Sequence, residues 1–154
     1  MEQPHIVFVC DSNSGRSIAA EYIARKYYPR TRFSSAGTKL KYDKPKPDCV
    51  KALLEFANID ASLEKCKLWT DIQGPIDVIV VLCCEPDGSC KRLDPPPPPQ
   101  TRLLHLPLDG LSEISATNLQ DANRVFIEMI DEAVREGLPR LLPDLLRADT
   151  ARVY

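Results

Sequence analysis

The stretch VFVCDSNSGRSIAAEYI, residues 7–23, indicates the fold of this chain. Its first four residues, VFVC, are the end of the apolar run HIVFVC of residues 5–10. Such a run is typical of a strand that is covered on both faces. Small and polar residues follow as a short loop, and residues 16–28 then place apolar side chains at helical spacing. A strand that passes through a short loop into a helix is the unit from which parallel α/β sheets are built.

The rest of the chain continues this alternation. We predict further strands in RFSSAGT (32–38), IDVIVVLCC (76–84) and TRLLHLPL (101–108), and helices in DCVKALLEFA (48–57) and SATNLQDANRVFIEMIDEAVREG (115–137). The first of these helices would turn Val50, Leu53, Leu54 and Ala57 inward, and the second would be capped by Ser115 and Gly137. The fold class is therefore a single α/β domain over residues 1–154, with a four-stranded parallel sheet and helices on both faces. The tail after residue 139 has no clear assignment, and DPPPPPQ (94–100) is expected to be a stiff connector.

The composition excludes several classes of protein. The 154 residues are 44% apolar and 27% charged with a formal net charge of -2, and no long basic run suggests a nucleic-acid or membrane partner. The start MEQPHIVFVC lacks the pattern of a signal peptide, and no apolar run approaches the roughly 18–20 residues of a membrane span. We therefore expect a cytoplasmic monomer.

The chain has six cysteines, whose roles must be weighed separately: Cys10, Cys49, Cys66, Cys83, Cys84 and Cys90. A cytosolic chain with its own core needs no disulfide framework. The absence of a C-x-x-C pair, with only two histidines, argues against a structural metal, and no cofactor is expected. Cys10 and Cys83 each end a predicted strand, so both should lie at the sheet edge where ligands of parallel sheets bind.

The loop after Cys10 has the chemistry of an oxyanion site. Its backbone N–H groups and the helix N-terminus would hold an anion, so the expected binding residues are Asp11, Ser12, Asn13, Ser14, Gly15, Arg16 and Ser17. Arg16 would grip two oxygens with its planar guanidinium, and Ser17 would donate its hydroxyl to the Cys10 sulfur. Asn13 and Gly15 tolerate the left-handed backbone of a tight cradle, and the same positive field makes Cys10 a nucleophilic thiolate.

VFVCDSNSGRSIAAEYI followed by FSSAGT resembles the low-molecular-weight protein tyrosine phosphatase superfamily, which also contains the thioredoxin-coupled arsenate reductases. The resemblance covers about the first 110 residues in order. Asp11 departs from it, because the family usually carries an uncharged residue there. Its carboxylate would repel an oxyanion, so we expect it to face solvent.

The resemblance implies two possible activities. The phosphatase branch carries an Asp-Pro-Tyr acid after the fourth strand, where HLPLDGLSE offers Asp109 without that proline or tyrosine. The reductase branch carries two cysteines with six residues between them after the third strand, and Cys83 and Cys90 in LCCEPDGSC have that spacing. HLPLD is also similar to the reductases' His-Trp-x-Phe-x-Asp stretch, with Leu106 in place of the tryptophan and the aspartate one place earlier.

The resemblance thus favours an arsenate reductase, with a phosphotyrosine phosphatase acting through a cysteinyl-phosphate as the alternative. Arsenate, which resembles phosphate, would be attacked by Cys10, and Cys83 would then attack Cys10 and release arsenite. Cys90 would form a disulfide with Cys83 for thioredoxin to reduce, and the exposed loop 85–89 would supply the movement. Cys84, next to Cys83, is the alternative relay thiol. A non-enzymatic oxyanion-binding or adaptor domain is the third hypothesis.

Other residues receive weaker assignments. Cys49 and Cys66 are expected to be spectators, His105 a hydrogen-bonded packing residue, and Trp69 a core or edge residue. Glu21 and Ser35 match positions that resemble a monovalent-cation site in some reductases.

Overall fold

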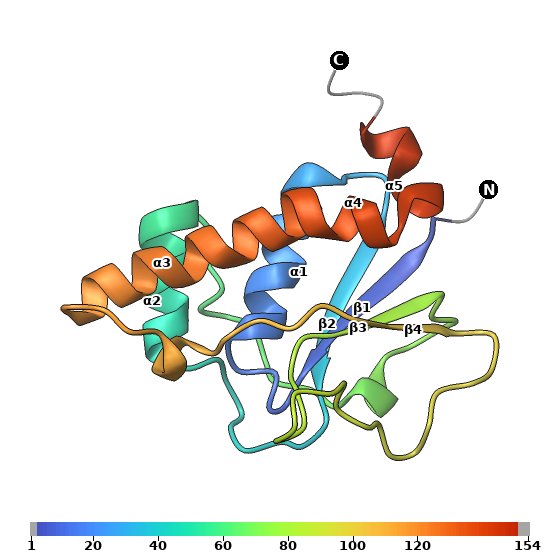
Figure 1. The fold of residues 1–154 in the computed structure, drawn as a ribbon, viewed down its shortest axis with the longest axis horizontal. Helices are drawn as coiled ribbons and strands as arrows, with labels where there is room; N and C mark the ends of the chain where they lie inside the picture. The colour runs from blue at the N-terminus through green and yellow to red at the C-terminus, as the bar shows by residue number, and fades with distance from the viewer. Residues whose placement is uncertain (1–2, 151–154) are drawn as a thin grey trace.

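The computed structural model describes residues 3–150, with side-chain surroundings given through residue 146. It contains a four-stranded sheet formed by β1 (His5–Cys10), β2 (Arg32–Gly37), β3 (Val78–Val81) and β4 (Arg102–His105). All pairings are parallel and the strand order is β2-β1-β3-β4, so β1 and β3 are central (Figure 1). The predicted single α/β domain with a four-stranded parallel sheet is therefore confirmed.

The helical elements are α1 (Arg16–Tyr27), α2 (Pro47–Ala57), η1 (Trp69–Asp71), η2 (Leu111–Glu113), α3 (Leu119–Glu132), η3 (Ala133–Gly137), α4 (Leu138–Leu141) and α5 (Pro143–Thr150). Of these, η1 and η2 are single 3-10 turns and η3 is a π-helical turn. The tail after residue 139, which the sequence left unassigned, is helical: α4 continues the line of α3, and α5 turns away from it (Figure 1).

The two faces of the sheet are covered differently. Ile6 and Phe8 of β1 pack into the larger core with α1, α2 and α3, whereas Val7 and Val9 pack against Trp69 on the other face. Among residues 3–150, that second face carries only the short η1 and loop segments, so the expected helical cover on this face consists of one 3-10 turn. The physical reason is the sequence of the connections: Gly74, Pro75 and the proline run of residues 95–99 disfavour helix formation.

The boundaries of α3 differ from the prediction, and both predicted caps are wrong. The helix begins at Leu119 because Asn118 is its N-cap, with Oδ1 accepting a hydrogen bond from Asp121 N at 2.8 Å. Gly137 has φ −74° and ψ −44°, so the chain remains right-handed helical and passes directly into α4. Ser115 lies outside the helix.

The buried face of α2 is rotated from the predicted one. Cys49, Ala52 and Leu53 are buried, whereas Leu54 is 52% exposed. The apolar spacing predicts a helix with one buried face. Tertiary packing buries the side of that face that contains Cys49 and leaves the side that contains Leu54 exposed.

The strands deliver two chain segments to one edge of the sheet. β3 ends at Val81, earlier than predicted, although Leu82 N still donates to Val9 O at 2.8 Å. Loop 11–15 and residues 82–90 therefore both leave from the carboxyl ends of the central strands. Among residues 3–150, no helix is long and apolar enough to cross a membrane.

Candidate active site at the carboxyl edge of the sheet

Cys10 ends β1 and lies at the N-terminus of α1. Its thiol is almost entirely buried, and its Sγ is 3.0 Å from the Oγ of Ser17 in the first turn of the helix. Gly15 is the N-cap of α1, so loop 11–15 is followed directly by the positive end of a twelve-residue helix. An anion above Cys10 would therefore be stabilised by that helix terminus.

The loop's peptide groups are oriented by the segment that follows β2. The carbonyl of Asp11 accepts hydrogen bonds from Thr38 N at 3.0 Å and Lys39 N at 2.9 Å, and the carbonyl of Ser14 accepts one from Lys46 N at 2.9 Å. In a planar trans peptide the C=O and the next N–H point in opposite directions. The N–H groups of Ser12 and Gly15 are thus turned away from this segment, as an anion cradle requires.

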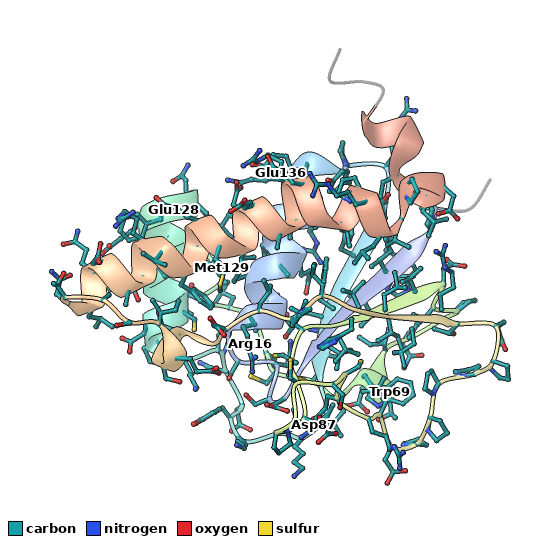
Figure 2. The ribbon with its side chains drawn as sticks, in the orientation of Figure 1. Arg16, Trp69, Asp87, Glu128, Met129 and Glu136 are labelled. Carbon is teal, nitrogen blue, oxygen red and sulfur yellow. The ribbon has the colours of Figure 1, made fainter. Side chains whose placement is uncertain are left out.

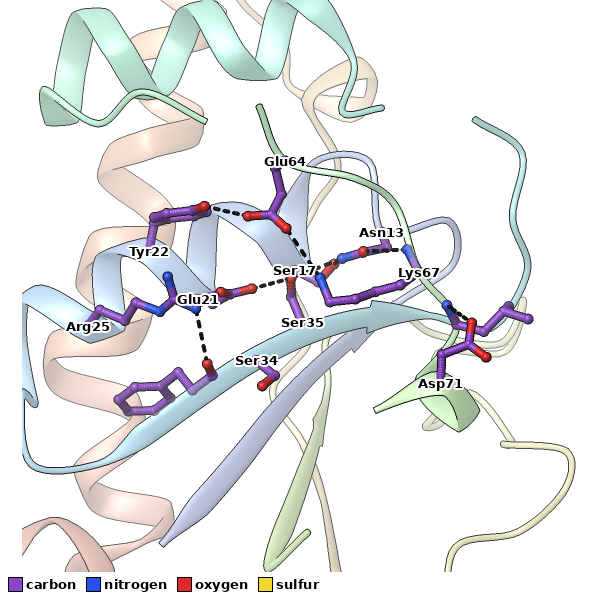
Figure 3. Close-up of polar contacts among 12 residues, drawn as sticks. Asn13, Ser17, Glu21, Tyr22, Arg25, Ser34, Ser35, Glu64, Lys67 and Asp71 are labelled. Carbon is purple, nitrogen blue, oxygen red and sulfur yellow. Dashed lines mark hydrogen bonds and ion pairs between the residues drawn. The ribbon is translucent and has the colours of Figure 1, made fainter. Parts of the chain in front are cut away.

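Asn13 fixes the loop from behind. It has a left-handed backbone (φ 54°) and is fully buried, and its Nδ2 donates to Ser17 Oγ at 2.9 Å and to Ser35 Oγ at 3.0 Å. Its Oδ1 accepts from Lys67 N at 2.9 Å, as Figure 3 shows. The Asn13 side chain therefore holds the loop in shape and leaves anion binding to the backbone.

Glu21 completes this network at its buried end. It accepts a hydrogen bond from Ser35 Oγ at 2.5 Å and forms an ion pair with Arg25 (Figure 3). Burial raises the pKa of the Glu21 carboxyl, while Ser35 and the charges of Arg25 and Lys67 oppose the rise. The Glu21 carboxylate thus already has Arg25 as a cationic partner, and the monovalent-cation site that Glu21 and Ser35 suggested stays a prediction.

Cys49 contacts the loop at Gly15, although the sequence analysis assigns it a spectator role. A Cβ on Gly15 would lie 2.8 Å from Cys49 Sγ, and Gly15 has φ −156°, outside the left-handed region. The close approach of Cys49 is thus one reason for a glycine at this position. Cys49 and Cys10 line the same cleft of about 90 Å³, and burial raises the pKa of Cys49 to about 11.

Arg16 is held at the mouth of this cleft. Its Nη1 donates to Leu108 O at 3.0 Å, and its Nη2 is 3.7 Å from Asp11 Oδ2. Asp11 also pairs with Lys91 at 3.8 Å, and its side chain is 43% exposed. The Asp11 carboxylate is thus partly exposed, as expected, and it also has two cationic partners that offset its repulsion of an anion.

A second cavity of about 390 Å³ adjoins Arg16 and contains two of the relay candidates. Its lining includes Asp11, Arg16, Cys83, Cys84 and Asp109. Cys83 is 1% exposed, and burial together with the Asp11 charge raises its pKa to about 12. In Figure 2, Arg16 lies by the lower end of α1, and Asp87 lies below it in the loop that follows these cysteines. The structure thus brings Cys83, Cys84 and Asp109 to the Arg16 side chain.

The third relay candidate pairs with Cys84. Cys84 and Cys90 form an antiparallel β-bridge, and Cys84 Sγ is 3.4 Å from the Nε2 of His105. Cys84 is exposed and Cys90 is partly buried, and all six cysteines are free thiols. His105 therefore contacts a candidate relay thiol in addition to its packing role, and Trp69, at 8% exposure, is a core residue as expected.

Several lining residues escape sequence reasoning. Lys46 and Glu113 line the Cys10 cleft, Glu113 also lines the second cavity, and Lys91 contacts Asp11. No local pattern distinguishes these charged residues from other surface residues. Of these three residues, only Lys46 has a sequence signal beside it, because it directly precedes Pro47, the first residue of α2.

Comparison with known proteins agrees with this geometry. The sequence model of the family described as low molecular weight phosphotyrosine protein phosphatase matches residues 5–104. No curated protein matches the chain as a relative. Among solved structures, an arsenate reductase from Archaeoglobus fulgidus has a TM-score of 0.63 at 21% identity, covering 85% of this chain and 99% of that one.

Two further structures represent both activities. A thioredoxin-dependent arsenate reductase from Corynebacterium glutamicum has a TM-score of 0.62 at 23% identity, and the match covers 92% of this chain and 63% of that one. A low molecular weight protein tyrosine phosphatase from T. tengcongensis has a TM-score of 0.68 at 18% identity, covering 90% and 99% of the two chains. These likenesses support the fold, and the family match spans well over half the sequence. The chain therefore belongs to the low molecular weight phosphotyrosine protein phosphatase family.

Proposed function

We propose that the protein is an arsenate reductase that uses Cys10 as nucleophile and a cysteine relay whose final disulfide is reduced by thioredoxin. The observation that carries the proposal is the second cavity, in which two thiols, Cys83 and Cys84, adjoin the Arg16 guanidinium of the oxyanion loop. A phosphatase needs no thiol there, whereas a reductase requires one within reach of the first cysteine.

The first step uses the oxyanion loop. Arsenate is held by the loop N–H groups and by Arg16, and the Cys10 thiolate attacks arsenic while one oxygen leaves as water after protonation. Ser17, 3.0 Å from the sulfur, stabilises the thiolate by donating its hydroxyl hydrogen. Asp109 and Glu113 line the adjoining cavity and are the carboxyls available to protonate the leaving oxygen.

The second step is the reduction. A thiolate of the Cys83–Cys84 pair attacks the Cys10 sulfur, and the S–As electron pair passes to arsenic, so that As(V) leaves as arsenite and a disulfide forms. Cys90 then attacks the second cysteine and releases Cys10 as a thiol. Thioredoxin, a protein dithiol, reduces the remaining disulfide by exchange.

The test is a single turnover with arsenate on fully reduced protein, followed by disulfide mapping. We expect one arsenite per chain and a disulfide that contains Cys90. The Cys10→Ser variant is the control and should release no arsenite.

The alternative is a phosphotyrosine phosphatase, which the two carboxyls beside Arg16 favour. Cys10 would then accept the phosphoryl group and Asp109 or Glu113 would protonate the phenolate. Aryl phosphate turnover that survives the combined change of Cys83, Cys84 and Cys90 to serine, without arsenate reduction by the parent protein, would replace the first proposal by this one.

A further inference from the structure

The hairpin of residues 84–90 presents two cysteines in the geometry of a disulfide. Cys84 and Cys90 are partners in an antiparallel bridge, and the adjacent Glu85 N donates to Ser89 O at 2.8 Å. That hydrogen-bond pattern makes Cys84 and Cys90 a non-hydrogen-bonded pair, whose Cα atoms lie about 4.5 Å apart in antiparallel strands. Disulfides span Cα separations of about 4.4–6.8 Å, so the pair needs no backbone movement to be bridged.

The turn that joins the two cysteines is ordered by its own sequence. Gly88 N donates to Glu85 O at 2.8 Å, and Gly88 has the positive φ of 89° that suits glycine. Asp87 Oδ1 accepts from Ser89 N at 3.0 Å and from Ser89 Oγ at 2.6 Å. Residues 85–89, expected from the sequence to be an exposed loop that supplies movement, therefore form the turn of a hydrogen-bonded hairpin that holds Cys84 opposite Cys90.

The same register separates Cys83 from Cys90. With Cys84 opposite Cys90, the residue opposite Cys83 is Lys91, and neighbouring side chains of a strand point to opposite sides. Cys83 is also buried at 1% exposure, with the pKa of its thiol raised to about 12. A bond between Cys83 and Cys90 would require the hairpin to slip by one residue.

His105 supplies a proton donor to the Cys84 sulfur. Its Nε2 is 3.1 Å from the carbonyl oxygen of Cys83 and 3.4 Å from Cys84 Sγ. A carbonyl oxygen only accepts, so Nε2 carries the hydrogen, and this single hydrogen is shared between the Cys83 oxygen and the Cys84 sulfur. An N–H directed at sulfur stabilises the thiolate, which is the form that attacks a disulfide.

We infer that Cys84 and Cys90 form a preorganised redox-active dithiol, with His105 as its positioning residue and Cys84 as its attacking thiol. A small disulfide such as oxidised glutathione is the oxidant. The Cys84 thiolate attacks one glutathione sulfur and expels a glutathione thiolate, and Cys90 then attacks the Cys84 sulfur and expels the second. The two protein thiols lose two electrons and two protons, and the glutathione disulfide gains them as two thiols.

Within the reductase the dithiol would make Cys84 the relay thiol, and this extension rests on the proposed function. Cys84 attacks the Cys10 sulfur of the arsenic adduct, arsenite leaves with the S–As electron pair, and a Cys10–Cys84 disulfide forms. Cys90 then attacks the Cys84 sulfur and Cys10 leaves as a thiolate. The final product is the Cys84–Cys90 disulfide, in which Cys84 is exposed and can be reached by a protein reductant.

The first test equilibrates the reduced full chain with mixtures of reduced and oxidised glutathione and then stops exchange with acid. Remaining thiols are labelled with a maleimide under denaturing conditions. A protease that cuts before aspartate then places Cys83 and Cys84 in the peptide of residues 77–86 and Cys90 in that of residues 87–93. We expect Cys84 joined to Cys90 and the label on Cys83. A label on Cys84, with Cys83 in the disulfide, would overturn the inference.

Variants test the same point independently. We expect Cys83→Ala to change the equilibrium constant for disulfide formation by less than about threefold, and Cys84→Ser to leave no disulfide to Cys90. His105→Leu should slow oxidation by glutathione about tenfold, and His105→Gln, which keeps an N–H donor, should restore part of the rate. Equal rates for the two His105 variants and the parent would remove His105 from the inference.

A final arm separates this inference from the proposed function. The same mapping after one arsenate turnover should again find Cys84–Cys90. If glutathione forms that disulfide while arsenate is not reduced, the reductase proposal fails and the dithiol stands. If arsenate is reduced but the mapped disulfide is Cys83–Cys90 under both oxidants, the dithiol inference fails and the reductase stands.

Discussion

The oxyanion loop of residues 10–17 and the hairpin of residues 84–90 leave the same edge of the sheet but are held in contrasting ways. The loop is bonded by distant segments: Asn13 contacts Ser35 and Lys67, and Ser14 contacts Lys46. The turn of the hairpin is bonded within residues 85–92, and its exposed Cys84 contacts His105 through the sulfur.

This difference separates two physical requirements. A site that binds a small anion depends on donors fixed to a fraction of an ångström, which buried long-range hydrogen bonds provide. A dithiol that exchanges with another molecule must expose its sulfur, and a locally bonded hairpin allows this without disturbing the core. Four substitutions should break or sharpen the contrast.

The largest effect is expected from substitution of Arg16, the guanidinium beside the oxyanion loop. Arg16→Lys replaces a planar fork, bonded to Leu108 O at 3.0 Å, by a single ammonium, and should lower kcat/KM for the oxyanion substrate by about 100-fold or more. Steady-state kinetics provide the measurement. The control is Arg124→Lys on the exposed side of α3, and an equal loss in both variants would refute a specific role for the guanidinium.

Gly37→Ala should be the next most severe change, because it presses on the loop from β2. A Cβ at Gly37 would lie 2.8 Å from Ser12 C and 2.9 Å from Asn13 N, both backbone atoms. We expect a loss of about 1–3 kcal/mol in unfolding free energy, measured in urea, together with weaker phosphate binding.

Gly137→Ala is the matched control for that substitution. The added Cβ would meet only Leu106 at 3.5 Å within a helical segment, so stability should be unchanged or higher by about 0.5–1 kcal/mol.

Gly37→Ala should leave the alkylation rate of Cys84 within about twofold of the parent. A large change in that rate would show that the loop and the hairpin are coupled.

The third change tests the buried end of the loop's network through pH. Burial raises the pKa of Glu21 above its ordinary 4.5, so the folded state binds this proton more tightly than the unfolded state. The stability contribution of Glu21 is therefore full below pH 4.5 and is lost as pH rises through the raised folded value. Urea unfolding across pH should show the parent losing stability relative to Glu21→Gln in that window, and a constant or growing advantage of the parent would contradict this.

The smallest effect is expected in the hairpin. Asp87→Ala removes the acceptor for Ser89 N and Oγ on an exposed turn, so the melting temperature should change by less than about 2 °C. Phosphate affinity should stay constant while disulfide formation between Cys84 and Cys90 weakens measurably. A fall in phosphate affinity equal to that of Gly37→Ala would abolish the distinction between the two regions.

The sequence by itself determined the features that depend on neighbouring residues. The strand ending at Cys10, the short polar loop and the helix starting at Arg16 follow from local periodicity and from the Cys-x5-Arg-Ser pattern. The parallel sheet follows from the alternation of strands and helices, which also brings Cys83 to the edge that holds Cys10.

The tertiary structure alone decided which side chains meet across elements. It placed Cys49 against Gly15, paired Asp11 with Arg16 and Lys91, and set the register in which Cys84 faces Cys90. Periodicity fixes the face that a residue occupies along its own element, but not the partner that packing brings to it. The distances between charges and thiols in this site depend on that packing.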